Sequence, residues 1–189
     1  MSGTALVGAL GDAVPSIHPQ AWVAPGAVIV GKVTIGRASS VWYGAVLRAD
    51  EDEISIASEC NLQDLCCVHV DPGEPAVIEC RVSVGHRATI HGARLETGSL
   101  IGIGAVVLGG ARIGRGSLVA AGTIVLPGRQ VPAGVLYAGV PGRIVRELTD
   151  EDRELFRQSP DRYIARAAQH RAASWGGGTA AADGPHSIA

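Results

Sequence analysis

Aromatic side chains are scarce in this sequence. Of its 189 residues only 4% are aromatic, with a single Phe and a single Met, whereas glycine occurs 26 times. Because a layered α/β core normally contains more large rings, we expect a narrow core filled by Val, Ile, Leu and Ala. Charged residues make up 18% of the chain and hydrophobic residues 47%, which excludes a chain that is disordered along its whole length.

An excess of charge of one sign and long apolar runs are also missing. There are 16 Lys and Arg residues against 18 Asp and Glu residues, for a formal net charge of −2. A nucleic-acid-binding surface requires a basic excess, so no nucleic-acid partner is expected. The longest apolar stretch, from Leu100 to Ala111, is interrupted by four glycines. We therefore expect no membrane-spanning helix and no membrane partner.

Targeting and disulfide signals are missing as well. No basic segment leads into an apolar one at the N-terminus, which argues against a signal peptide. The four cysteines form no C-x-x-C pair, so neither a zinc ribbon nor a redox dithiol is indicated. These cysteines are Cys60, Cys66, Cys67 and Cys80. The pattern predicts a cytoplasmic protein with reduced thiols.

What the sequence does contain is a repeat of six residues. Aliphatic residues recur at this interval, interrupted by a few slips, over more than a hundred residues, and small residues follow most of them four positions later. Neither an amphipathic helix nor an alternating strand has this period. In a parallel β-helix, each hexapeptide supplies one short strand and a corner, and three of them close a triangular coil. The repeat therefore predicts an all-β fold, a single-stranded parallel β-helix whose aliphatic residues point inwards.

The repeat ends near Pro132, and the composition then changes. Thr149 precedes three acidic residues, a pattern typical of a capped helix start, and Pro160 is expected to divide the following stretch into two helices. The Gly/Ala-rich end is expected to be disordered. The predicted units are an N-terminal segment 1–12, the β-helix 13–135, a connector 136–148, a C-terminal α-helical segment 149–173 and a disordered tail 174–189.

Winding the repeat into coils brings two histidines into register. Leu47, Val68 and Ile90 occupy the same face of successive coils. Side chains alternate along a strand, so the residues that follow these three point outwards. They are Arg48, His69 and His91. Neighbouring strands lie about 4.8 Å apart, which lets the two imidazoles share a metal ion.

A third histidine, His86, lies on a different face. It follows Val84 by two residues and stacks on Asp64 of the preceding coil. The faces of a triangular prism diverge by about 120°, so His86 does not easily reach His69 and His91 within one chain. A copy related by cyclic symmetry brings it there. The spacing therefore suggests a homotrimer with a metal ion held by two histidines of one chain and His86 of the next.

Other polar residues receive plainer interpretations. Asp50 and Asp64 are candidate supporting residues or interface ion-pair partners, and Arg48 is their candidate cation. Cys60 and Cys66 fall in the small-residue column, which indicates packing, and no chemistry is assigned to any thiol. The lone histidines are interpreted as solvated surface residues. They are His18, His170 and His186.

The segments around these residues form a recognisable set. They are Val46-Leu47-Arg48-Ala49-Asp50, Asn61-Leu62-Gln63-Asp64, His69, Gly85-His86-Arg87-Ala88-Thr89-Ile90-His91-Gly92 and Leu136-Tyr137-Ala138-Gly139-Val140-Pro141-Gly142-Arg143. Together they resemble the gamma-class carbonic anhydrases over roughly residues 12–170. The resemblance implies a left-handed β-helix, contrary to the usual crossover rule. It also implies a homotrimer with a metal ion at each subunit interface.

The resemblance further implies a lyase that reversibly hydrates CO₂ to bicarbonate by metal-bound hydroxide at the trimer interfaces. Three imidazoles with an open metal position suit Zn²⁺, and Fe²⁺ or Co²⁺ are alternatives. By resemblance, the metal ligands are His69, His86 and His91. Gln63 matches a residue that hydrogen-bonds the metal-bound water, Arg48 one near bicarbonate, and Tyr137 one that lines the site. Asp50, Asn61 and Asp64 match supporting or interface positions.

The sequence departs from the family's archetype in the route for protons. The archetype carries a long acidic loop with a shuttling glutamate after the first histidine, whereas residues 70–75 here are short and offer no match. Glu51 matches a second archetypal glutamate and is the candidate proton relay, with a solvated acidic loop as the equal alternative. Gly139 also stands where the archetype has an asparagine. The level of CO₂ hydration therefore stays open.

Two other classes of function share the repeat. A hexapeptide acyltransferase, or a thioesterase using acyl-CoA, has the same β-helix and a similar exit segment at residues 138–143. Acyl transfer needs one histidine as a general base, whereas a metal site needs three. A non-catalytic trimeric scaffold whose metal ion holds the interface is the remaining alternative, because structural metal sites are closed and catalytic ones keep an open position.

Overall fold

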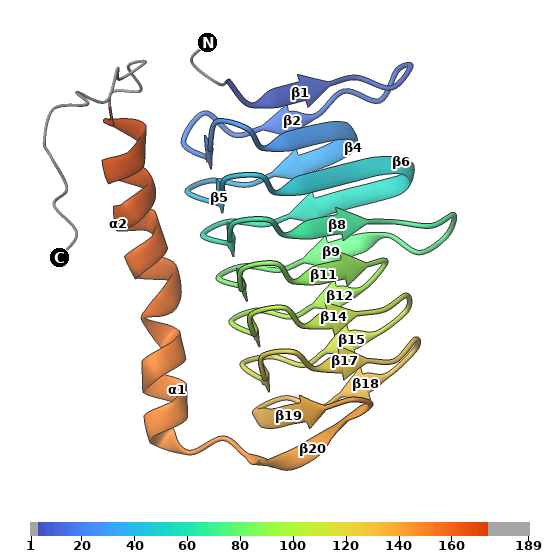
Figure 1. Cartoon of the computed structure of the whole chain (residues 1–189), viewed down its shortest axis with the longest axis vertical. Coiled ribbons are helices and arrows are strands. Elements are labelled where there is room, and N and C mark those ends of the chain that lie inside the picture. The colour runs from blue at the N-terminus through green and yellow to red at the C-terminus, as the bar shows by residue number, and fades with distance from the viewer. Residues whose placement is uncertain (1–3, 174–189) are drawn as a thin grey trace, which may run out of the picture.

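A computed structural model describes residues 4–173 and shows a parallel β-helix with two α-helices along one side (Figure 1). Its strands are β1 Leu6–Gly8, β2 Ser16–Ile17, β3 Trp22–Val23, β4 Val28–Ile35, β5 Ser40–Val41, β6 Val46–Ile56, β7 Asn61–Leu62, β8 Cys67–His69, β9 Ala76–Ile78, β10 Ser83–Val84, β11 Thr89–His91, β12 Arg94–Leu95, β13 Leu100–Ile101, β14 Val106–Val107, β15 Arg112–Ile113, β16 Leu118–Val119, β17 Ile124–Val125, β18 Gln130–Val131, β19 Val135–Gly139 and β20 Gly142–Glu147. The helices are α1 Asp150–Arg157 and α2 Ser159–Arg171. The predicted fold class is confirmed.

The strands stack into three parallel faces. The first, here called the histidine face, contains the first half of β6 followed by β8, β11, β14 and β17. The second contains the second half of β6 followed by β9, β12, β15 and β18. The third, here called the helix face, contains β3, β5, β7, β10, β13, β16 and β19. The long strands β4 and β6 each bend around a corner and so contribute to two faces.

Columns of aliphatic side chains fill the interior. On the histidine face Leu47 pairs with Val68, and Val68 with Ile90, all fully buried. Each coil repeats the same inward position, so the columns form one continuous core along the axis. Corners leave little room for a side chain. At Gly31, where φ is +84°, an added Cβ would lie 2.0 Å from the carbonyl oxygen of Ala49, so only glycine fits there.

The two helices begin where the sequence places their signals. Thr149 forms a capping box with Asp152, in which each side chain accepts a hydrogen bond from the other residue's backbone N–H. Pro160 lies in the first turn of α2. Helix α2 lies along the helix face (Figure 1) and packs Tyr163 and Ala167 against Trp42. Within residues 4–173, no helix is both long and apolar enough to cross a membrane. The predicted tail 174–189 lies outside the described residues.

The β-helix extends past both predicted boundaries. Strand β1 pairs in parallel with β4, so the first coil begins inside the segment 1–12. Strand β19 pairs in parallel with β16, and β20 returns antiparallel to it, so the connector 136–148 is largely strand. Strand pairing needs only backbone groups in register, and it continues where the aliphatic repeat is irregular. Strand pairing therefore continues on both sides of the predicted range 13–135.

The interior columns make a direct stability prediction. Ile113 is fully buried, whereas Ile144 on β20 is 49% exposed. We expect Ile113→Ala to lower the free energy of unfolding by about 2–5 kcal/mol, because it leaves a cavity in a close-packed column. The matched control Ile144→Ala is expected to change it by less than about 0.5 kcal/mol. Thermal and denaturant unfolding measure both values, and equal losses would contradict the assignment of the columns.

Candidate metal centre

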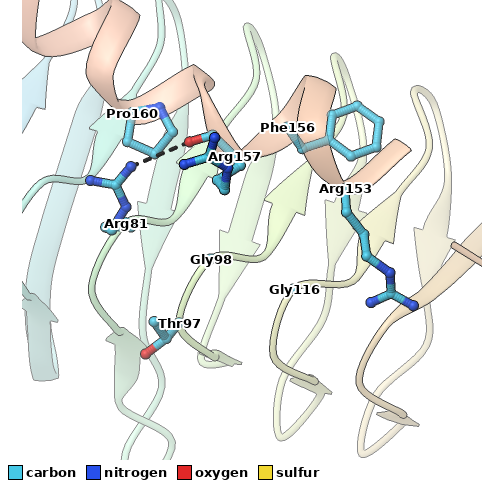
Figure 2. Close-up of a pocket in the computed structure, with 8 residues that line it drawn as sticks. All are labelled: Arg81, Thr97, Gly98, Gly116, Arg153, Phe156, Arg157 and Pro160. Atoms are coloured by element: carbon cyan, nitrogen blue, oxygen red, sulfur yellow. Dashed lines mark hydrogen bonds between the residues drawn. The ribbon is translucent and has the colours of Figure 1, made fainter. Parts of the chain in front are cut away.

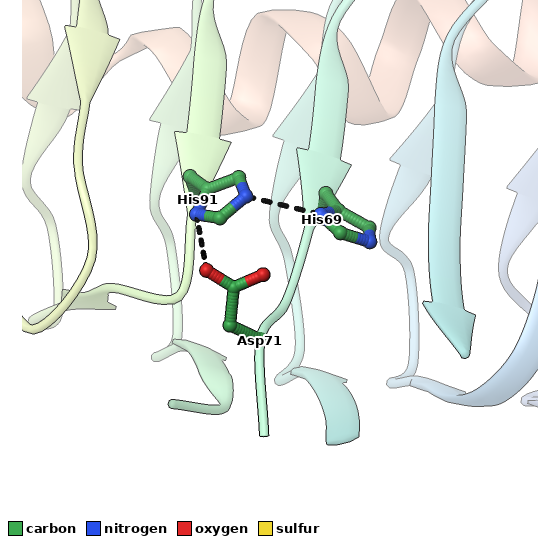
Figure 3. A group of neighbouring side chains, drawn as sticks. All are labelled: His69, Asp71 and His91. Carbon is green, nitrogen blue, oxygen red and sulfur yellow. Dashed lines mark hydrogen bonds and ion pairs between the residues drawn. The ribbon is translucent and has the colours of Figure 1, made fainter. Parts of the chain in front are cut away.

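The histidine face holds an imidazole pair. His69 ends β8 and His91 ends β11, and the two residues are direct neighbours in the parallel ladder, as the coil spacing predicts. The Nδ1 atom of His69 lies 3.0 Å from Nε2 of His91 (Figure 3). Their side chains are 15% and 30% exposed. Two nitrogen donors thus face each other in a partly buried position on rigid strands.

A carboxylate stands behind each of these imidazoles. Asp50 Oδ1 lies 3.0 Å from Nε2 of His69, and Asp71 Oδ2 lies 3.7 Å from Nδ1 of His91 (Figure 3). Metal-ligating histidines typically hold their second ring nitrogen against a carboxylate in this way, which fixes the tautomer and the ring orientation. The nitrogens that face each other are therefore the ones left for a ligand.

Asp50 also interacts with Arg48. The Arg48 guanidinium contacts the carboxylate of Asp50, which lies two residues further along the same strand, β6. Burial alone raises the pKa of Asp50, but hydrogen bonds from its own backbone N–H, from His69 and from Arg48 outweigh burial and hold this pKa below its usual value. The structure therefore brings together the predicted residues Arg48, Asp50, His69 and His91, with Asp50 ionised at neutral pH.

Sequence reasoning missed Asp71. The segment after His69 was treated only as a shortened loop, yet strand alternation continues into it. Val70 is fully buried and Asp71 is exposed on the same side as His69. The outward position two residues after a candidate ligand is the signal that could have found it.

His86 lies on another face, as predicted. It follows β10, its Nδ1 is 2.8 Å from Asp64 Oδ2, and its side chain is 40% exposed. Among the described residues, the group that could hold a metal ion within one chain is His69, Asp71 and His91, whose ligand atoms all lie within 4.8 Å of one another. One chain therefore does not bring the three predicted histidine ligands together.

The remaining site residues fall into the same division. Asn61 and Gln63 lie on or next to β7 of the helix face, both buried, with Gln63 Nε2 donating to Asn61 Oδ1 at 3.0 Å. Each chain thus carries these residues in two separate groups, here called half-sites. The histidine-pair half-site comprises Arg48, Asp50, His69, Asp71 and His91, and the His86 half-site comprises Asn61, Gln63, Asp64 and His86.

Two predicted residues lie apart from the histidines. Tyr137 is 1% exposed and points into the core, in register with the inward Val119, so in this chain it fills the last coil. Its strand β19 is separated from β10 by β13 and β16. Glu51 is exposed on β6 directly after Asp50. Glu51 therefore adjoins the histidine-pair half-site only as the neighbour of Asp50 in the sequence, and Tyr137 lies in the core.

An aromatic cavity adjoins the His86 half-site. It measures about 330 Å³ and is lined by Trp42, Tyr43, Asp64, His86, Tyr163, Arg166 and His170. Tyr43 Oη lies 2.7 Å from His170 Nδ1, and the His170 ring packs against Trp42. The interpretation of His170 as a solvated surface residue is therefore wrong, because α2 folds it back onto the helix face. Burial, followed by the Asp64 charge, raises the pKa of Tyr43.

A second cavity, of about 340 Å³, lies between the helix junction and the corners of the β-helix (Figure 2). Three arginines line it, but their charges are paired. Arg81 donates to Glu59, to both carboxylate oxygens of Asp161 and to the carbonyl oxygen of Arg157. None of the histidines lines this cavity. The Arg81 hydrogen bonds beside it connect the helices to the β-helix.

The buried thiols have packing roles. Burial raises the pKa of Cys60 and of Cys66 to about 12. Their Sγ atoms donate to the carbonyl oxygens of Glu79 and Gly85, at 3.0 and 3.1 Å. Both therefore stay protonated at neutral pH. Cys67 and Cys80 are exposed.

The donor set fits a divalent metal ion. Two imidazole nitrogens converge, and carboxylates hold both rings from behind. Imidazole nitrogen suits Zn²⁺, Fe²⁺ and Co²⁺ alike. Within the described part of one chain, the further donor group is the Asp71 carboxylate, whose ligand atom lies within 4.8 Å of both imidazole donors. These residues do not distinguish between the three metal ions.

No family model matches this chain, but individual relatives do. The "Probable carbonic anhydrase" of Methanocaldococcus jannaschii is 56% identical over 142 residues, which cover 75% of this chain and 89% of that protein. The mitochondrial gamma carbonic anhydrase 1 of Arabidopsis thaliana is 39% identical over 85% of this chain, a match that spans 61% of the plant protein.

Solved structures agree on the fold. A hexapeptide transferase family protein from Anaplasma phagocytophilum superposes with a TM-score of 0.84 at 34% identity, covering 87% of this chain and 97% of that one. Such hexapeptide-repeat proteins have the left-handed β-helix that the sequence predicts. Identity to these curated relatives, at 56% and 39%, is higher than the 34% identity to this transferase. The chain belongs to the gamma-class carbonic anhydrase family.

Proposed function

We propose that this protein is a metal-dependent carbonic anhydrase that interconverts CO₂ and bicarbonate. The observation that carries the proposal is the imidazole pair of His69 and His91 with a carboxylate behind each ring. Arrangements of this kind raise ligand basicity and hold the rings still for a metal ion. The names of the relatives at 56% and 39% identity support the same activity.

We propose further that the working unit is a homotrimer in which the two half-sites of neighbouring chains meet. Exposed apolar side chains lie near both half-sites. Leu126 follows β17 on the histidine face and is 48% exposed, and Ile103, next to His86 at the corner, is also 48% exposed. Leu65, one coil before His86 on that edge, is 60% exposed. Pairing these surfaces in a closed ring buries all of them.

In that assembly His69 and His91 of one chain and His86 of the next would hold the metal ion. Zn²⁺ is the proposed ion, with Fe²⁺ and Co²⁺ as alternatives for the same nitrogen donors. When bound, the metal ion supplies the Lewis acidity that makes water a nucleophile at neutral pH. Asp50 and Asp64 lie 3.0 and 2.8 Å from a ring nitrogen of His69 and His86, and Asp71 lies 3.7 Å from Nδ1 of His91.

The chain's own residues handle charge and orientation. The Arg48 side chain is 48% exposed beside the histidine pair, so its guanidinium is available to attract the bicarbonate anion. Gln63 contributes a buried amide that orients a hydrogen-bonding ligand at the site. Exposed Glu51 is the proposed proton acceptor towards bulk water, because its position next to Asp50 needs no long loop.

Acyl transfer is the second candidate function. The observation in its favour is the fold shared with the Anaplasma phagocytophilum hexapeptide transferase family protein. A general base works with one free imidazole nitrogen, whereas His69 and His91 direct theirs at each other. We therefore place CO₂ hydration first. A trimeric scaffold with a structural metal ion is the outcome if a metallated trimer is inactive.

Removing one histidine of the pair tests the activity. We expect His91→Ala to lower metal-dependent CO₂ hydration, measured by stopped flow on the metal-quantified trimer, by more than about 100-fold. Loss of an outer carboxylate partner alone costs about 10- to 100-fold in such sites. The matched control is His18→Ala, an exposed histidine far along the chain, which is expected to keep full activity. A fully metallated, inactive wild-type trimer would refute CO₂ hydration.

Proton transfer through Glu51 gives a second prediction. Glu51→Ala should slow hydration at saturating CO₂ about tenfold or more in weak buffer, and added imidazole should restore the rate. Glu53→Ala is the matched control, because Glu53 is already paired with Lys32 at 2.9 Å. Buffer-dependent stopped-flow rates decide the matter. An unchanged rate in Glu51→Ala would remove this residue from the mechanism.

Coenzyme A distinguishes the two enzyme classes. A ligand at 100 times its Kd stabilises a protein by about 2.7 kcal/mol, which shifts the melting temperature by several degrees. We expect millimolar coenzyme A to leave the melting temperature of the metal-loaded trimer unchanged. A saturable rise would instead favour acyl transfer.

A further inference from the structure

A buried chain of hydrogen bonds runs from the His86 half-site to the C-terminal helix. Gln63 Nε2 donates to Asn61 Oδ1 at 3.0 Å, Asn61 Nδ2 donates to Ser83 Oγ at 2.8 Å, and Ser83 Oγ donates to Ser159 Oγ at 3.0 Å. All four side chains are buried, with exposures of 8%, 0%, 2% and 8% from Gln63 to Ser159. The middle of this hydrogen-bond network, at Asn61 and Ser83, is therefore shielded from bulk water.

This chain of hydrogen bonds connects the β-helix to helix α2. Asn61 and Ser83 are direct partners in the ladder between β7 and β10, so the coil spacing fixes their separation. Ser159 is the first residue of α2 and approaches from outside the β-helix. The orientation of Gln63 is thus linked, through two side chains, to the position of the helix.

The helix is clamped at this point. Arg81, next to β10, donates to Asp161 and to the carbonyl oxygen of Arg157, on either side of Ser159. Figure 2 shows the hydrogen bond to Arg157. The same guanidinium also donates to Glu59 of the preceding coil. These bonds leave the Ser159 hydroxyl little freedom to move away from Ser83.

The donor-to-acceptor direction of these hydrogen bonds determines which atom of the Gln63 amide, Oε1 or Nε2, remains available to a ligand. Because Asn61 gives its Nδ2 to Ser83, its Oδ1 faces Gln63 and takes the Nε2 donor. Gln63 Oε1, an acceptor, then remains for a ligand. A hydroxyl can donate or accept, so Ser83 keeps this direction only while Ser159 accepts its proton. Without Ser159, Ser83 can donate to Asn61, both amides can flip, and Gln63 presents its NH₂ group instead.

We propose that Ser83 and Ser159 are positioning residues that fix the orientation of the Gln63 amide through Asn61. The proposal rests on the proposed function in one respect, that Gln63 acts at the metal site. An acceptor oxygen there favours a protonated oxygen on the ligand, whereas an NH₂ group favours an unprotonated one. The helix junction thereby sets the polarity of the hydrogen bond that Gln63 offers to a ligand.

The chain offers a matched control. The hydroxyl of Ser99 is buried at a neighbouring corner and has no hydrogen-bond partner among the described residues. Ser99→Ala removes the same atoms from the same kind of environment without touching the network. Ser159→Thr keeps a hydroxyl at the start of the helix and serves as the rescue variant.

The direct test is the side-chain amide NMR spectrum of the full-length, assembled protein labelled with ¹⁵N-glutamine. The Gln63 signals are assigned by their loss in Gln63→Glu. We expect Ser159→Ala and Ser83→Ala to shift the Gln63 amide signals, Ser159→Thr to restore them, and Ser99→Ala to leave them in place. Unmoved Gln63 signals in both serine variants, or an equal shift in Ser99→Ala, would overturn the proposal.

Kinetics separate this role from a merely structural one. With metal content and melting temperature matched to wild type, Ser159→Ala is expected to lower kcat for CO₂ hydration about fivefold to tenfold, the effect of one hydrogen bond. The KM should stay unchanged, and Ser159→Thr should recover the rate. Loss of activity only in proportion to lost metal or lost trimer would contradict positioning. If the wild type does not hydrate CO₂, the proposed function fails, and the amide spectrum still decides this inference.

Discussion

The six-residue column of inward aliphatic side chains is the constraint on which the rest of the structure depends. On the histidine face, the fully buried side chains of Leu47, Val68 and Ile90 stack on one another, and this stacking fixes the register of the strands. A shift by one residue would turn the outward side chains of a strand inwards. The meeting of His69 and His91 is therefore a consequence of core packing. The strand register alone places the two imidazole rings on neighbouring strands.

The triangular coil also keeps the predicted metal ligands of one chain apart. A triangular coil sends its faces in different directions, so residues as close in sequence as His86 and His91 cannot meet within one chain. Each chain therefore carries two separate half-sites, each with its own carboxylates, and exposed apolar side chains lie near both. In the proposed trimer, symmetry would complete the site, and the proposed activity would then depend on the assembly. The helix contributes as well, because α2 covers the aromatic cavity beside His86.

Periodicity and local signals made much of this predictable. The inward columns, the lateral pairing of His69 with His91 and the Thr149 cap all follow from short-range spacing. Contacts between segments far apart in the sequence did not. Two such contacts depend on how α2 packs against the helix face: the packing of His170 on Trp42 and the hydrogen bond from Ser83 to Ser159. Tyr137 matches a site residue in its motif, but its inward register was hidden because a tyrosine breaks the aliphatic pattern.

The most direct test of the account is complementation between two inactive variants. Homotrimers of His86→Ala and homotrimers of His91→Ala should each fail to hold stoichiometric metal, because every interface lacks one ligand. Trimers mixed from both variants should regain one complete set of ligands, from His69 and His91 of a His86→Ala chain and His86 of a His91→Ala chain. Metal analysis of isolated mixed trimers measures this. Recovered metal would support a site shared between chains, whereas full metal in the His86→Ala homotrimer would contradict it.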